Sequence, residues 1–189
     1  MEEKEVTMKN SKKGFTLAEV LVTLTIIGVI AALTLPLLMG GTNTASFKTG
    51  YKKAISVLSQ AIMMNQSKDL NGPNLCAACD QAGATGSQAL ATYFASSINT
   101  LGAPAAGVFT SADGMVFTFT HSATATGCAD DTVFANAVCT VMVDVNGAKA
   151  PNALTTGATS TTLKDRFNII IQSSGVIPGD AGALAVSQN

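Results

Sequence analysis

The chain of 189 residues has little of what catalysis and nucleic-acid binding require. It has no Trp and one His, and aromatic residues make up 5%, so the groups for base stacking and proton transfer are few. Charged residues make up 12%, against about 25% in an average soluble protein. The net charge of −1 disfavours a nucleic-acid partner, which needs a basic surface. With no Gly-rich phosphate loop and no nucleophile motif either, the sequence predicts no enzymatic activity.

The few charges are unevenly distributed. Residues 1–14 hold four Lys and three Glu, whereas Glu19 is the only charge from Phe15 to Phe47. As a helix, the apolar run 15–39 would span roughly 37 Å, and a hydrocarbon core is about 30 Å thick. Lys12 and Lys13 precede it and predict a cytoplasmic N-terminus. We therefore expect a single-pass membrane anchor, with the rest of the chain outside the cytoplasm.

A cleaved secretory signal does not explain this arrangement. Such a signal ends in small residues after its apolar stretch, whereas here Leu37, Leu38 and Met39 lead into Gly40-Gly41-Thr42. The small residue lies before the run, at Gly14. A glycine lets an extended backbone enter a protease without a side-chain clash, which predicts a cut after Gly14.

Glu19 is the informative residue of the apolar run. A carboxylate at such a position costs about 2.5–3.5 kcal/mol on insertion scales, and we expect the segment itself to supply no partner. A cut after Gly14 would create an α-amine on Phe15, four residues before Glu19. In a stack of helices, the amine of one subunit could then neutralise Glu19 of another. This pairing predicts that Phe15 and Glu19 set subunit registry.

The string Lys12-Lys13-Gly14-Phe15-Thr16-Leu17-Ala18-Glu19 resembles the processing site of type IV prepilins and type II secretion pseudopilins. The resemblance is specific across residues 12–45. It implies cleavage after Gly14 by a prepilin peptidase, N-methylation of Phe15 and use of Glu19 in registry. Implied partners are pilin subunits, the inner-membrane assembly machinery and, before assembly, lipid. Gly28 and Pro36 match positions where the helix of this family loosens or bends.

A second helical stretch is predicted for residues 44–68, separated from the first because Pro36 lacks an N–H and Gly40-Gly41 adds slack. Its apolar residues recur at spacings of three and four and predict a stripe that packs on a sheet. These residues are Phe47, Tyr51, Ala54, Ile55, Leu58, Ala61 and Ile62.

The remainder predicts an α+β pilin-like fold, with a long N-terminal helix on a small antiparallel sheet. A short helix is expected at 88–99, and strands at 115–120, 138–145, 167–171 and 183–186. Asn146-Gly147 predicts a type I′ turn. The series from Val143 to Phe167 also resembles a loop-and-strand pattern of pilin C-terminal domains. The expected parts are a leader (1–14), a membrane and filament-core helix (15–39), an amphipathic half (40–70) and a globular head (71–189).

Four cysteines lie in the part expected outside the cytoplasm, where disulfides persist. Of three possible pairings, proximity in sequence favours Cys76–Cys79 and Cys128–Cys139. Zinc is an alternative, because Cys76-Ala77-Ala78-Cys79 has metal-knuckle spacing. Redox chemistry is a weaker one, because no thioredoxin-like context surrounds the pair.

No cofactor and no metal residues are predicted. Calcium remains an alternative through Asp144, Asp165 or Asp180, since some pseudopilins bind calcium in this half of the chain. The lone His121, in a stretch of Ser, Thr and Ala, is expected at the surface, and Asp130-Asp131 in a solvated loop.

The sequence therefore favours a structural subunit of a type IV pilus-like filament, anchored in the inner membrane and then assembled into a periplasmic or extracellular filament. A type II secretion pseudopilin or a minor pilin is an alternative within the same class. A membrane-tethered binding domain is an alternative from another class, and it predicts that the leader persists.

Overall fold

A computed structural model describes most of the chain. The described residues are 14–68, 79–124, 127–128, 137–159, 161–172 and 175–188, with the backbone alone for 36–42. The chain divides into two compact units, Met1–Gly40 and Gly41–Asn189. We call the second the head unit. Cys76 and Asp130-Asp131 lie outside the described residues.

One long helix, α1 (Leu17–Lys68), contributes to both units. The predicted long N-terminal helix is confirmed, but the interruption expected around Pro36 and Gly40-Gly41 is wrong, because α1 continues through both. A single proline removes one main-chain hydrogen bond, and the turns on either side keep theirs. A bend at Gly28 or Pro36 stays a prediction.

The part of α1 in the head unit carries the predicted apolar stripe. This prediction is confirmed, since every member except the half-buried Ile55 is buried. Tyr51 stacks on Phe167 of the sheet, with 4.5 Å between ring centroids. The helix is therefore fixed to the sheet by side chains at helical spacing.

Five antiparallel strands form one sheet in the order β1-β2-β3-β4-β5. The register places Phe117, Val143 and Phe167 side by side on the buried face. The α+β architecture and the three longer strands are confirmed, whereas no strand was expected at the positions of β1 and β5. The strands are β1 (Val108–Thr110), β2 (Val116–His121), β3 (Cys139–Asp144), β4 (Arg166–Ile171) and β5 (Val176–Pro178).

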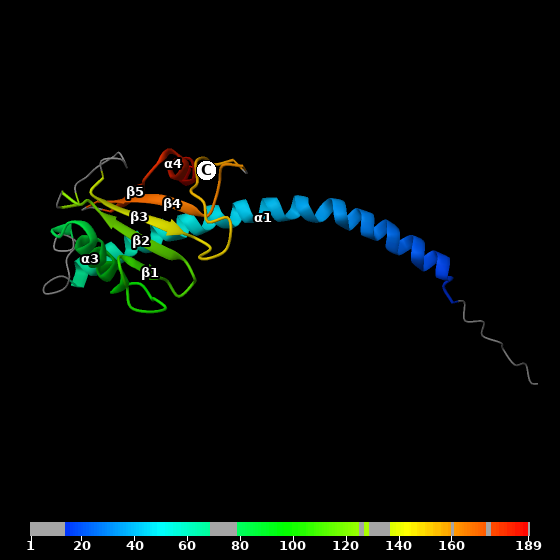
Figure 1. Ribbon diagram of the computed structural model, residues 1–189, viewed down its shortest axis with the longest axis horizontal. Helices are drawn as coiled ribbons and strands as arrows, with labels where there is room; N and C mark the ends of the chain where they lie inside the picture. The colour runs from blue at the N-terminus through cyan, green and yellow to red at the C-terminus, as the bar shows by residue number, and fades with distance from the viewer. Residues whose placement is uncertain are drawn as a thin grey trace, which may run out of the picture. The chain divides into compact units, whose positions relative to one another are not determined.

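Among the described residues, the head unit also contains two shorter helices (Figure 1). Helix α3 (Gly83–Ala95) packs on the same sheet face as α1, because Phe94 stacks on Phe119 at 5.1 Å. It begins and ends earlier than the predicted helix 88–99. Helix α4 (Ala181–Gln188) lies beside β4 and β5, where residues 183–186 were expected to form a strand. That prediction is wrong, because the carboxylate of Asp180 caps a helix by accepting the Ala183 N–H at 2.7 Å.

The turn after β3 also differs from its prediction. A type I′ turn requires positive φ at both central residues, whereas only Gly147 of the pair has one, at 69°. The Asn146 N–H instead donates to Asp144 Oδ1 at 3.3 Å, which forms a local side-chain turn. The chain then enters a long connection to β4 and does not form a tight hairpin.

Candidate functional site

The predicted processing segment lies just before α1. Gly14, Phe15 and Thr16 are outside the helix and exposed. No atom lies within 4 Å of a side chain built at Gly14. An exposed peptide outside regular secondary structure is accessible to a protease, which is compatible with cleavage at the Gly14–Phe15 bond.

Glu19 has a hydrogen-bond partner within its own segment. The Thr16 N–H and the Thr16 hydroxyl each donate to Glu19 Oε2 at 2.8 Å, and the Glu19 N–H donates to Thr16 Oγ1 at 3.3 Å. This is a capping box, for which Thr-Leu-Ala-Glu before an apolar run is a recognisable signature. The expectation that the segment supplies no partner is therefore wrong. Thr16 supplies no positive charge, however, so neutralisation by the Phe15 amine stays a prediction.

The apolar run of α1 meets the physical requirements of a membrane span. Leu17–Leu35 is one helix segment of 19 residues, long and apolar enough to cross a bilayer. Its Thr25 and Thr34 hydroxyls donate to carbonyl oxygens one turn earlier, at 2.8 and 3.0 Å. These bonds satisfy the polar groups inside the helix, as lipid requires. The segment is consistent with inner-membrane anchoring.

Three cysteines meet in the head unit. The sulfurs of Cys79, Cys128 and Cys139 all lie within 4.8 Å of one another. Cys128 is at bonding distance from both of the others, with Cα–Cα distances of 5.5 Å to Cys79 and 5.4 Å to Cys139. Both separations suit a disulfide, so Cys79–Cys128 is an alternative to the predicted Cys128–Cys139 pair. The Cys76–Cys79 pair stays a prediction.

His121, expected at the surface, is buried at the end of β2. Its Nε2 lies 2.9 Å from the Cys79 carbonyl oxygen, and its Nδ1 lies 3.0 Å from the Ser122 carbonyl oxygen. The ring fits because position 86 is glycine, where a Cβ would lie 2.8 Å from His121 Cγ. The alternation along β2 places His121 on the same buried face as Phe117 and Phe119. The groups that cover the ring come from α3 and Cys79, which meet β2 only in the fold.

The aspartates considered for calcium accept hydrogen bonds from the protein itself. Asp165 accepts the N–H groups of Asn152 and Ala153 at 2.8 and 2.9 Å. Asp144 pairs with Arg166 at 2.9 Å. Among the described residues, the cysteines are the only group of three or more potential metal ligands that lie together. Asp144 and Asp165 therefore act as structural acceptors that order the β3–β4 connection, whereas Asp180 accepts hydrogen bonds from Asn168 and from the start of α4.

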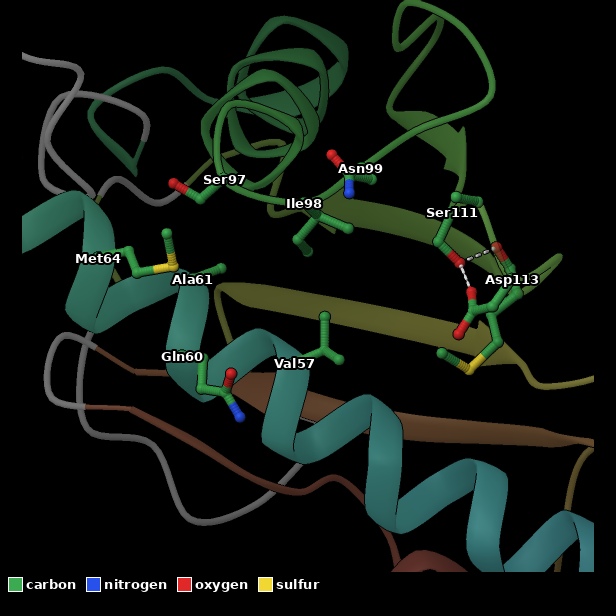
Figure 2. Close-up of a pocket in the computed structure, with 11 residues that line it drawn as sticks. Val57, Gln60, Ala61, Met64, Ser97, Ile98, Asn99, Ser111 and Asp113 are labelled. Carbon is green, nitrogen blue, oxygen red and sulfur yellow. Dashed lines mark hydrogen bonds between the residues drawn. The ribbon is translucent and has the colours of Figure 1, made fainter.

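A cleft of about 330 Å³ lies between α1 and the segments that follow α3 and β1. Figure 2 shows Val57, Ala61 and Met64 on its α1 side, opposite Ile98. Its one carboxylate belongs to Asp113, which accepts a hydrogen bond from Ser111 and pairs with Lys53 at 2.6 Å. The cleft is a mainly apolar hollow, and its ionisable group is already paired.

The apolar helix segment and the exposed bond before it are the features of a pilin-type N-terminus, and they are consistent with anchoring in the inner membrane. Residues 9–35 match the model of the prokaryotic N-terminal methylation motif. This motif is typical of type IV pilins and pseudopilins, which are generally structural proteins without enzymatic activity. It implies processing by prepilin peptidase and assembly with pilin-like subunits. No curated protein and no solved structure matches the chain.

Proposed function

We propose that the protein is a structural subunit of a type IV pilus-like filament, cut after Gly14 and N-methylated on Phe15. The match of residues 9–35 to the methylation motif carries this proposal. Two features support it. The Gly14–Phe15 bond is exposed outside α1, and the helix after it is long and apolar enough for a membrane.

Before assembly, α1 would hold the subunit in the inner membrane, with lipid around residues 17–35. On assembly the same surface would pack against helices of other subunits, so that protein contacts replace lipid contacts. Because lipid is as apolar as the helix, the hydrophobic effect does not drive this association. Close packing and hydrogen bonds between helices would have to favour it instead. The Phe15 amine of one subunit beside Glu19 of another would favour one register over others, because any other register leaves both charges unpaired.

The intact mass of the full chain, coexpressed with a prepilin peptidase, tests the proposal. We expect loss of residues 1–14 and gain of one methyl group. A Gly14→Leu variant is the matched control and should keep its leader. An unprocessed wild-type chain would instead support a membrane-tethered binding domain. If the chain is processed, electron microscopy of sheared surface material would distinguish a surface pilus from a periplasmic pseudopilus.

A further inference from the structure

A shallow hollow lies at the start of α1 and is lined by Phe15, Glu19, Val20 and Thr23. Glu19 supplies its one charge, and no cation among the described residues pairs with that carboxylate. The other side chains supply an aromatic ring, methyl groups and a hydroxyl. A carboxylate in an otherwise apolar segment needs a counter-charge, so the hollow suits a cationic group on an apolar chain.

Two oxygen atoms of this hollow can still accept hydrogen bonds. Both bonds from Thr16 go to Oε2 of Glu19, and Oε1 accepts none from the described residues. The Thr23 hydroxyl donates its proton to the Val20 carbonyl oxygen at 2.9 Å, so its oxygen is left as an acceptor. Thr23 follows Glu19 by four residues on one helix, and such pairs have Cβ atoms about 5–6 Å apart. A single nitrogen between them can therefore reach both oxygens.

We propose that Glu19 Oε1 and Thr23 Oγ1 of one subunit together bind the N-methylammonium group of Phe15 of a second copy. This inference rests on the proposed function, which already pairs the amine with Glu19, and it adds Thr23 as the second acceptor. A methylated α-ammonium group has two N–H donors, whereas an unmethylated one has three. Two donors therefore meet two acceptors, and Val20 offers an apolar contact for the methyl group.

This match gives the methyl group a physical role in assembly. A polar group left without a partner in apolar surroundings is costly, and the third N–H of an unmethylated amine would be such a group. Methylation removes that N–H and keeps the positive charge that Glu19 attracts. Before assembly, Thr23 itself costs little in lipid, because its proton is bonded to its own helix.

Variants of Thr23 in the full chain test the proposal, in cells that supply a prepilin peptidase and the assembly machinery. Thr23→Val keeps the shape of the side chain and removes the acceptor, so the yield of sheared filaments should fall at least about fivefold, with cleavage and membrane binding unchanged. Thr23→Ser keeps the oxygen and should stay within about twofold of the wild type. Thr25→Val is the matched control, because Thr25 also bonds to its own helix but lies outside the hollow, and it should stay within the same range.

These outcomes separate this inference from the proposed function. A wild-type chain that is not cut, or is cut and forms no filaments, would overturn both. Wild-type filaments together with an undiminished yield from Thr23→Val would overturn the role of Thr23 alone. Equal losses in Thr23→Val and Thr23→Ser, or in Thr23→Val and Thr25→Val, would do the same, because they would indicate a general packing effect.

The match of donors to acceptors has its own test. Growth with limiting methionine lowers the supply of methyl donor and gives a wild-type sample that is cut but only partly methylated. Intact mass then compares the methylated fraction in sheared filaments with that in the membrane pool. We expect the unmethylated chain to be at least about twofold rarer in filaments, because it would bury one unsatisfied N–H. Equal fractions in the two pools would overturn the match.

Discussion

Arg166 Nε lies 2.9 Å from Oδ2 of the buried Asp144 carboxylate, and the two residues face each other across β3 and β4. The same guanidinium donates to Asn152 Oδ1 at 3.0 Å. The pair therefore joins the ends of two central strands to the long connection between them. Removing either partner would leave the other without its main contact.

Replacing Arg166 with Met should destabilise the full chain by about 2 kcal/mol, because a buried carboxylate would lose its counter-charge. The expected loss is below the range for fully buried pairs, since the Arg166 side chain is 34% exposed. Urea unfolding in detergent micelles, followed by circular dichroism, measures it. The double variant Asp144→Asn/Arg166→Met should lose less than Arg166→Met alone, and an equal or larger loss would contradict the pairing argument.

Gly86→Ala should destabilise the head unit by more than about 2 kcal/mol. A Cβ at this position would lie 1.7 Å from the Gln81 carbonyl oxygen and 2.8 Å from His121 Cγ, so backbone must shift. Gly102→Ala is the control, because no atom lies within 4 Å of its added Cβ, and it should change stability by less than about 0.5 kcal/mol. Comparable unfolding midpoints for the two variants would refute the close packing of α3 on His121.

Tyr51→Phe should leave stability unchanged or raise it by up to about 1 kcal/mol. The Tyr51 hydroxyl is buried without a hydrogen-bond partner among the described residues, and such a group carries a desolvation cost. Burial, and then the nearby Asp180 carboxylate, raises the pKa of Tyr51 well above its usual value, so the group stays neutral. Tyr51→Leu should instead cost about 1–3 kcal/mol, because it loses the ring stacked on Phe167. Thermal unfolding of both variants checks this order, and a marked loss in Tyr51→Phe would reveal a missed hydroxyl contact.

Asp113→Asn should remove a small, pH-dependent part of the stability. Partial burial alone would raise the pKa of Asp113, but hydrogen bonds from Lys53 and Ser111 and the Lys53 charge outweigh it and hold the pKa below its usual value. A carboxyl whose pKa falls on folding stabilises above its unfolded pKa of about 4, and the effect is lost as pH falls through the folded pKa.

We therefore expect the wild type to exceed Asp113→Asn by less than about 1 kcal/mol at pH 7, since the pair is largely solvated. The difference should disappear near pH 2.5 in urea titrations. A difference that grows on acidification would contradict the sign of this linkage.

Glu19→Ala should be processed and membrane-bound but fail to enter filaments, because the Phe15 amine of a neighbour would lose its counter-charge. Intact mass, membrane fractionation and electron microscopy of sheared material check the three parts. Normal filaments from this variant would end the registry proposal.

The capping box allows charge and helix capping to be separated. Glu19→Gln keeps an acceptor for the Thr16 N–H and loses the charge, whereas Thr16→Ala keeps the charge and loses both hydroxyl contacts. We expect Glu19→Gln to fail in assembly and Thr16→Ala to assemble once processed. The reverse result would assign the role of Glu19 to capping its own helix.

Local patterns predicted much of the fold, and they failed where distant segments meet. The stripe from Phe47 to Ile62 identified the packed face of α1, because helical spacing is a property of neighbouring residues. The apolar segment 183–186 is too short to show whether its period is that of a strand or of a helix. The Asp180 carboxylate caps a helix there, so the predicted strand does not form. His121 was placed at the surface for a related reason, since its cover comes from α3 and Cys79.

The sequence by itself determined the N-terminal segment. The charge gap and the Gly14–Phe15 step depend only on neighbouring residues, so they can be recognised without the fold. The Thr16–Glu19 spacing is equally local, although the hydrogen bonds between the two residues were not expected. Only the tertiary structure decided which cysteines meet, because Cys79 is brought to Cys128 and Cys139 by the packing of β2, β3 and the chain before α3. Proximity along the chain favoured one partner for Cys128, and proximity in space adds a second.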